Sequence, residues 1–235
     1  MDKQQKIVAM FDDIAKTYDL ANRIISFGAD TAWRQRGCRE AFALLGSVER
    51  PLIVDVATGT GDMIGVWHHE AARAGLRGIE TVGIDPSVGM LTVARKKFPD
   101  TTFIEATATA IPLADESADL SSIAYGIRNV VERKKAWREF YRILRPGGLL
   151  VILEFTRANR AFLAPLARWY LQNILPWIGA LVSRNYAAYK YLPKSIDEFL
   201  STDEMAEELQ EAGFEVVTAQ NYSFGVCTLM IARKP

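Results

Sequence analysis

The sequence predicts an α/β protein whose doubly wound, mostly parallel sheet has seven strands, with helices before it and an antiparallel hairpin at its end. Between residues 52 and 155, short apolar runs alternate with segments of helical periodicity. Residues 3–45 instead carry apolar side chains at helical spacing, and near the C-terminus two strand-like runs follow each other without a helix. The length of 235 residues fits a single domain.

The expected elements follow one another in a regular order. Helices are expected within residues 3–45, and Gly46 and Pro51 mark the break that ends them. Strands are expected at 52–57, 81–85, 102–105, 120–124 and 149–155, and the hairpin at 214–219 and 226–232. Helices are expected at 62–74, 87–97 and 133–144. Because strand–helix–strand units cross over with a right hand, the parallel part should be Rossmann-like.

Charge and composition limit the classes of function that the protein can have. The 28 Lys and Arg residues balance the 28 Asp and Glu residues, whereas a protein that binds nucleic acid through its phosphates should be basic, so we expect no nucleic-acid partner. Cys38 and Cys227 are far apart and His68 and His69 are adjacent, a spacing that predicts neither a disulfide framework nor a metal site. The first residues lack the apolar core of a signal peptide, which predicts a cytoplasmic protein.

One long apolar stretch, residues 161–182, raises the question of a membrane span. It contains Arg168 and the prolines Pro165 and Pro176. A spanning helix tolerates such residues only where neighbouring groups satisfy them. We therefore expect that this segment does not cross a membrane.

The first expected strand contains Asp55 near its end and runs into a turn that contains Gly59, Thr60 and Gly61. Glycines let the chain turn sharply and let a ligand approach the backbone. The second strand ends at Asp85, whose carboxylate can accept hydrogen bonds from the two hydroxyls of a ribose. Because ligands of an open parallel sheet bind beyond the carboxyl ends of its strands, these residues predict a nucleotide site.

Two other interpretations of this turn compete with that prediction. A nicotinamide cofactor would require a third glycine three residues after Gly61, where the sequence has Ile64. Asp62 would also face the pyrophosphate of such a cofactor unfavourably. A plain surface turn would leave the acid at the end of the second strand unexplained. A positively charged cofactor without phosphate fits the pattern better.

Together, the first strand, the glycine turn, the following helix and Asp85 resemble the class I S-adenosylmethionine-dependent methyltransferases. Residues 142–148 resemble the stretch that precedes the fifth strand in that family. The resemblance implies S-adenosyl-L-methionine as the cofactor. It also implies that the glycine turn borders the methionine moiety and that Asp85 holds the ribose.

The same resemblance assigns the adenine end of the cofactor. Residues 103–113 resemble the segment that borders the adenine, so Thr107 and Ala108 are expected beside it, and Ala124 is expected against the cofactor at the end of the fourth strand. Two of these positions depart from the family pattern. Thr107 stands where Asp or Asn is common, and Ala124 stands where Ser or Gly is common. Both departures weaken the case for side-chain hydrogen bonds there and leave the backbone amide of Ala108 as a donor.

Sequence outside this core resembles the quinone-biosynthesis C-methyltransferases, the family that methylates demethylmenaquinol and, in some bacteria, a ubiquinol precursor. The resemblance covers nearly the whole chain and rests on residues 11–34, 125–130, 153–155 and 189–196. It implies a prenylated quinol as the substrate, most directly demethylmenaquinol. Methylation of a ubiquinol precursor or of another small molecule stays open, as does a non-catalytic scaffold that only binds the cofactor.

Methyl transfer to a ring carbon needs an electron-rich ring, so we expect the reduced quinol, with an ionised ring hydroxyl, to be the acceptor. The reaction then demands positioning more than covalent catalysis. Arg128, at the end of the fourth strand, is expected to stabilise the phenolate, and Asn129 to orient the ring oxygen. Tyr18 and Asp19 are expected to close over the site, with Asp19 as a candidate proton acceptor.

Each of these roles competes with a purely structural one. Arg128 could form an ion pair with an acid such as Glu154, and Asn129 could form a hydrogen bond within a turn. Tyr18 and Asp19 could lie on the surface of a helix.

A prenylated substrate gives the apolar stretch at 161–182 a function. Its Trp and Tyr residues suit a transient contact with the membrane surface, which would place the protein at the inner face of the cell membrane. A core-facing lid and a homodimer contact are the alternatives. Within the single domain, 1–235, we expect four parts: a helical lid at 1–46, a cofactor-binding core at 47–156, a helical substrate-side insertion at 157–200, and a terminal helix and hairpin at 201–235.

Overall fold

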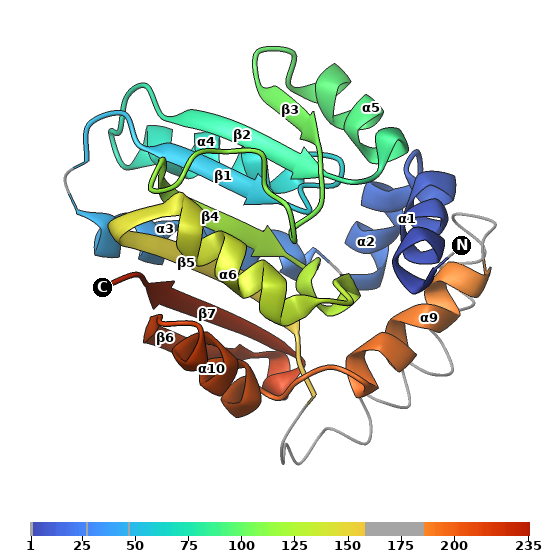
Figure 1. The fold of residues 1–235 in the computed structure, drawn as a ribbon. Coiled ribbons are helices and arrows are strands. Elements are labelled where there is room, and N and C mark those ends of the chain that lie inside the picture. The colour runs from blue at the N-terminus through green and yellow to red at the C-terminus, as the bar shows by residue number, and fades with distance from the viewer. Residues whose placement is uncertain (1, 27, 47, 158–185) are drawn as a thin grey trace.

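The computed structural model describes residues 2–26, 28–46, 48–157 and 186–235. Its centre is a seven-stranded sheet in the order β3-β2-β1-β4-β5-β7-β6 (Figure 1). The strands are β1 (Leu52–Val56), β2 (Glu80–Asp85), β3 (Thr102–Glu105), β4 (Ala118–Ala124), β5 (Leu144–Phe155), β6 (Glu215–Tyr222) and β7 (Cys227–Arg233). Strands β1 to β5 pair in parallel, and β7 is antiparallel to both β5 and β6. The predicted sheet and its terminal hairpin are confirmed.

Helices cover both faces of the sheet. The described helices are α1 (Lys3–Ile14), α2 (Tyr18–Ser26), α3 (Ala29–Leu45), α4 (Asp62–Arg73), α5 (Val88–Lys97), α6 (Arg133–Ile143), α9 (Tyr186–Asp197) and α10 (Thr202–Glu211), with 3-10 turns η1 (Ile127–Asn129) and η2 (Ser223–Gly225). Helices α3 and α4 pack on one face, and α5 packs against α4 on the same side. Helices α6 and α10 pack on the other face.

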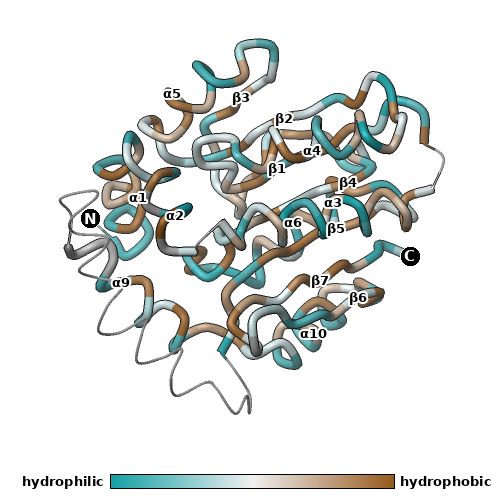
Figure 2. Tube along the Cα trace, turned by 180° about the vertical axis from the view of Figure 1, so that it is seen from behind, coloured by the Kyte–Doolittle hydropathy of each residue, from teal (hydrophilic) through white to brown (hydrophobic). Residues whose placement is uncertain are grey.

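Alternation along β1 shows how the sequence builds these two layers. Ile53 belongs to the hydrophobic cluster that contains Trp67 of α4, whereas Val54, the next residue, belongs to the cluster that contains Trp137 of α6. Successive side chains of a strand point to opposite faces, so a strand covered on both faces reads as a continuous apolar run. Figure 2 shows hydrophobic residues along β5 and β7 in the same position between layers. Burial of each such side chain contributes roughly 1.5–3 kcal/mol.

The strand boundaries differ from the prediction by up to three residues at β4 and β6, and most at β5. The fifth strand was expected to begin at residue 149, after a turn, but β5 begins at Leu144. Leu144 pairs with Ala118, and the register between β4 and β5 shifts before Leu120 pairs with Leu149. Both Leu144 and Ala118 are fully buried, so pairing ahead of the turn keeps their backbone groups satisfied.

Helices α1, α2 and α9 lie beyond the carboxyl ends of the central strands (Figure 1). Helix α9 contacts both α1 and η1. Among the described helices, none is both long and apolar enough to cross a membrane. The apolar stretch at 161–182 lies outside the described residues.

Candidate active site

A cavity opens where α1 and α2 meet the carboxyl ends of β1, β2 and β4. In the strand order, β2 and β4 lie on opposite sides of β1, so the connections diverge here, which is where open α/β sheets bind ligands. The cavity brings together most of the residues that the sequence singled out, namely Tyr18, Asp55, Gly59, Thr60, Asp85, Thr107, Ala108, Ala124 and Asn129. Gly61, Asp19 and Arg128 are not among the described residues that line it.

The glycine turn has the backbone conformation that its sequence suggests. Gly59 and Gly61 have φ angles of +58° and +83°, in the left-handed region that favours glycine. A Cβ atom on Gly59 would meet nothing within 4 Å, whereas one on Gly61 would lie 3.0 Å from the Phe98 ring. Gly59 therefore faces the cavity, and Gly61 allows α4 to begin close against Phe98.

Asp85 is tied to this turn through the backbone. Its Oδ2 accepts a hydrogen bond from the Gly59 amide at 2.9 Å, and its Oδ1 accepts one from the Ser87 amide at 2.8 Å. Each carboxylate oxygen can accept a further hydrogen bond. Burial raises the pKa of Asp85 to about 6, although these two amide hydrogen bonds act to lower it.

Asp55 is a second buried acid at the same edge. Its carboxylate accepts hydrogen bonds from the hydroxyls of Thr58 and Ser122, both at 2.6 Å. Ser122 lies opposite Asp55 in the register of β1 and β4. Burial raises the pKa of Asp55 to about 6.

The two acids determine which ligand fits. Neither Asp55 nor Asp85 forms an ion pair with a described residue, so a positively charged ligand would compensate their desolvation. A pyrophosphate would be repelled by them. The described residues therefore fit S-adenosyl-L-methionine, a cation without phosphate, and they contain no cluster of three or more His, Cys, Asp or Glu that could hold a metal ion.

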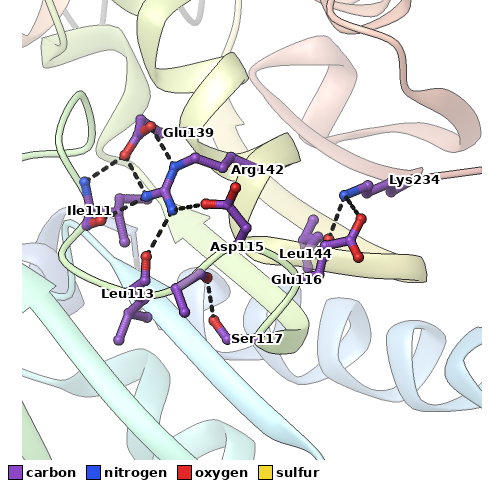
Figure 3. Close-up of polar contacts among 10 residues, drawn as sticks. Ile111, Leu113, Asp115, Glu116, Ser117, Glu139, Arg142, Leu144 and Lys234 are labelled. Atoms are coloured by element: carbon purple, nitrogen blue, oxygen red, sulfur yellow. Dashed lines mark hydrogen bonds and ion pairs between the residues drawn. The ribbon is translucent and has the colours of Figure 1, made fainter.

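The loop after β3 carries the residues that were expected beside the adenine, and a partly buried network of hydrogen bonds holds it in place. Arg142 donates hydrogen bonds to the carbonyl oxygens of Ile111 and Leu113, each at 2.8 Å (Figure 3). The Ile111 amide donates to Glu139 at 2.8 Å, and hydrogen bonds from Arg142 lower the pKa of that carboxyl. Within the loop, the Thr107 hydroxyl is engaged with Thr109 at 3.0 Å.

Helix α2 closes over the glycine turn through Asp19. The Thr60 hydroxyl donates to Asp19 Oδ1, and Lys97 Nζ lies 2.7 Å from Asp19 Oδ2. Lys97 Nζ also lies 2.7 Å from the carboxylate of Asp62. Tyr18 lines the cavity, and burial raises the pKa of its phenol. Both residues of α2 thus contact the site.

Arg128 forms the ion pair with Glu154 that was the structural alternative to its expected role. Its Nη1 donates to Glu154 Oε1 and to the carbonyl oxygen of Tyr125, both at 2.6 Å, so the ion pair with Glu154 is present. Its Nε is buried without a hydrogen-bond partner. Arg128 lines a second cavity, which Tyr191 of α9 also lines.

Asn129 lies between the two cavities and lines both. Its Nδ2 donates to the Tyr125 carbonyl oxygen at 3.4 Å, a weak form of the expected turn hydrogen bond. Its Oδ1 is buried without a partner. Arg128 and Asn129 therefore carry a spare donor and a spare acceptor at the junction of the cavities.

Three contributing residues were missed by the sequence reasoning. Asp12 of α1 accepts hydrogen bonds from the Ser87 hydroxyl at 2.6 Å and from the Gly89 amide at 2.8 Å, which fixes α1 against the start of α5. Lys97 holds α2 in place through its ion pair with Asp19. Arg34 of α3 lines the main cavity. The sequence around a charged helical residue does not show whether its side chain forms such a contact or lies in solvent.

Comparisons with known proteins agree with this geometry. The sequence profile of the ubiE/COQ5 methyltransferase family matches residues 1–234. A ubiquinone/menaquinone biosynthesis C-methyltransferase UbiE of Campylobacter jejuni is 51% identical and covers 100% of both chains. A demethylmenaquinone methyltransferase of Thermus thermophilus is 39% identical over 96% of this chain and 100% of that protein. A crystal structure from Thermotoga maritima, described as a SAM-dependent methyltransferase and possible histamine N-methyltransferase, shares the fold with a TM-score of 0.63 and 22% identity, and covers 97% of this chain and 100% of that one.

Proposed function

The chain belongs to the ubiE/COQ5 methyltransferase family, and we propose that it methylates a ring carbon of demethylmenaquinol to give menaquinol. That it is a C-methyltransferase of quinone biosynthesis, with S-adenosyl-L-methionine as its cofactor, follows from the family and its relatives. The observation that carries the proposal for the ring is the junction of the two cavities, where Arg128 and Asn129 have unpaired buried polar atoms.

The cofactor supplies an electrophilic methyl group on its sulfonium. We assign the ribose hydroxyls to Asp85, because its carboxylate is fixed by two amides and retains acceptor capacity. Thr107 and Ala108 are assigned to the adenine, since their loop is held from behind by Arg142. The cavity wall formed by Gly59 and Ala124 carries no bulky side chain, which leaves room for the rest of the cofactor.

We assign the quinol ring to the side of Arg128. Its buried Nε can donate to a ring oxygen, and a charge-assisted hydrogen bond in a buried site favours the ionised phenolate. The Oδ1 of Asn129 can accept a hydrogen bond from a protonated ring hydroxyl. Ionisation raises the electron density on the adjacent ring carbon, which then attacks the methyl group. Arg128 does not act as the base, because a guanidinium stays protonated.

We assign Asp19 to holding α2 over the glycine turn and not to accepting the ring proton. One of its oxygens accepts from Thr60 and the other pairs with Lys97. Both oxygens of its carboxylate are therefore already engaged by groups of the protein. The ring proton then leaves to water after the methyl group is transferred. Tyr18, partly buried beside the cavity, limits the access of bulk solvent to the reacting atoms until the methyl group has been transferred.

We also propose that the protein contacts the membrane surface at the cytoplasmic face, where a prenylated quinol resides. The exposed side chains of Leu20 and Ile24, 58% and 40% accessible, lie four residues apart on α2 and support an apolar contact near the site. Cosedimentation with liposomes tests this, and a protein that stays wholly in the supernatant would contradict it. A homodimer formed through the apolar stretch at 161–182 is the alternative, and its signature is a doubled mass in sedimentation.

The experiment for the substrate compares two acceptors directly. Purified protein and S-adenosyl-L-methionine are incubated with equal amounts of short-tail demethylmenaquinol and of the unmethylated ubiquinol precursor, and mass spectrometry measures both methylated products. We expect the larger kcat/KM for demethylmenaquinol. Methylation of the ubiquinol precursor alone would overturn the choice of substrate and leave the reaction class intact.

A further inference from the structure

Arg34 is a buried cation that the proposed reaction has not used. It is 8% exposed in α3 and lines the main cavity. Among the described residues that line this cavity, it is the one with a full positive charge. Its Nε atom is buried without a hydrogen-bond partner. A buried donor left unpaired costs about 1–3 kcal/mol, so such a residue is expected to meet an acceptor when the site is filled.

The surroundings of Arg34 hold the guanidinium in place without satisfying it. The carboxylate of Asp30, one turn earlier in α3, is 3.8 Å away, which is an ion pair but not a hydrogen bond. The guanidinium carbon lies 4.9 Å from the centre of the Tyr125 ring, in a cation–π contact. Tyr125 is itself fixed by stacking on Phe155, with ring centroids 4.8 Å apart. The guanidinium is therefore positioned in advance, and its Nε keeps a hydrogen-bond donor for which the described residues supply no acceptor.

The reaction offers two anionic groups, the carboxylate of the cofactor's methionyl group and the quinol phenolate. Arg34 shares its cavity with the glycine turn and with Asp55, and its charge acts to lower the pKa of Asp55. Arg128 lines the other cavity. An amino acid carries its carboxylate and its ammonium on one carbon, so a site with a cation close to an acid suits it. Arg34 therefore matches the methionyl carboxylate, and Arg128 matches the phenolate.

We propose that Arg34 binds the carboxylate of the methionyl group of S-adenosyl-L-methionine and thereby sets the position of the sulfonium in the cavity. The guanidinium fork matches a carboxylate with two parallel hydrogen bonds. The inference uses the cofactor alone and does not depend on which quinol is methylated.

Calorimetry with two ligands tests this on the purified full-length protein. S-adenosylhomocysteine carries the carboxylate, and 5′-methylthioadenosine lacks the entire amino-acid group. In Arg34→Gln, we expect affinity for S-adenosylhomocysteine to fall roughly 10- to 100-fold, the effect of a lost charge-assisted hydrogen bond, while affinity for 5′-methylthioadenosine changes less than about twofold. Arg34→Lys should recover part of the loss, because it keeps the charge but not the fork.

Arg36→Gln, two residues along the same helix, is the matched control. Arg36 is exposed and does not line the cavity, so both affinities should stay unchanged. Equal loss of both ligands in Arg34→Gln would make Arg34 a structural residue, and unchanged affinity with a reduced kcat would move it to the quinol. Either result overturns the proposal. If Arg34→Gln does not fold, Arg34→Lys carries the same two-ligand comparison.

Discussion

At the scale of single residues, Asp85 is the residue on which cofactor binding depends most directly. In Asp85→Ala, affinity for S-adenosylhomocysteine should fall by about 1–3 kcal/mol, because charge-assisted hydrogen bonds to the ribose are lost. Calorimetry measures it, and Asp85→Asn separates lost charge from the amides of Gly59 and Ser87 that alanine would leave unpaired. Asp100→Ala, on the exposed surface, is the control. Wild-type affinity in both Asp85 variants would remove Asp85 from the ribose.

The two buried acids also predict a pH dependence of binding. Burial raises the pKa of Asp55 and of Asp85 to about 6. A cationic cofactor favours their ionised forms, so affinity for S-adenosyl-L-methionine should rise by up to about tenfold in total between about pH 5 and pH 7 for each acid that must ionise, and then level off. Calorimetry across that range, with Asp85→Asn as the variant that loses part of the slope, checks it. A flat profile would contradict it.

Stability without cofactor should follow the opposite trend. Between the unfolded pKa, about 3.9, and the folded value, the folded state holds the protons that the unfolded state has lost. The free energy of unfolding is therefore expected to fall as pH rises through about 6. Thermal melts of the cofactor-free protein at several pH values, compared with Asp55→Asn, measure this contribution.

Arg128 calls for a variant that keeps its ion pair, because removing one partner of a buried pair costs about 3–5 kcal/mol. Arg128→Lys retains a positive charge beside Glu154 but loses the Nε donor and the guanidinium geometry. We expect kcat to fall by roughly 10- to 100-fold with cofactor affinity within about twofold of wild type. Steady-state kinetics and calorimetry give the two values. Normal turnover would leave Arg128 with a structural role.

At the scale of elements, the attachment of α2 to the core is the feature with the clearest consequence. Asp19 joins α2 to Thr60 of the glycine turn and to Lys97 at the end of α5. In Asp19→Ala, the global free energy of unfolding should change by no more than about 1 kcal/mol, since the ion pair is partly exposed. The dissociation rate of S-adenosylhomocysteine should nevertheless rise several-fold, because the cover over the site is released.

Stopped-flow measurement of cofactor release checks this prediction for α2. Lys134→Ala is the matched control, because its ion pair with Glu211 is exposed and neither residue lines the cavity. Release at the wild-type rate in Asp19→Ala would show that α2 does not retain the cofactor. High salt should accelerate release in the wild type and less so in the variant.

At the scale of the whole molecule, the sheet was predictable because each strand and helix is marked by a pattern of neighbouring residues. The apolar runs of β1, β2 and β4 and the periodicity of α4 and α6 are each readable within a short window. The glycine turn and the acids near the carboxyl ends of β1 and β2 were predictable for the same reason, since parallel strands bring these ends to one edge.

Other features depend on contacts between distant parts of the chain. The early start of β5 at Leu144 requires Ala118 as a pairing partner. Arg34 is covered by the ring of Tyr125, and Asp19 forms its ion pair with Lys97. Nothing in the residues next to Arg34 or Asp19 distinguishes a buried partner from solvent, so only the folded arrangement identifies them.

The proposed reaction transfers a methyl group from S-adenosyl-L-methionine to a carbon of a reduced, prenylated quinone. The most direct test incubates purified protein and the cofactor with short-tail demethylmenaquinone, either chemically reduced or oxidised, and measures products by mass spectrometry. Formation of a product one methyl heavier from the quinol, and none from the oxidised quinone, is the predicted result. Equal methylation of both forms would contradict the role of an ionised ring. If neither form is methylated although the cofactor binds, the proposed substrate is wrong.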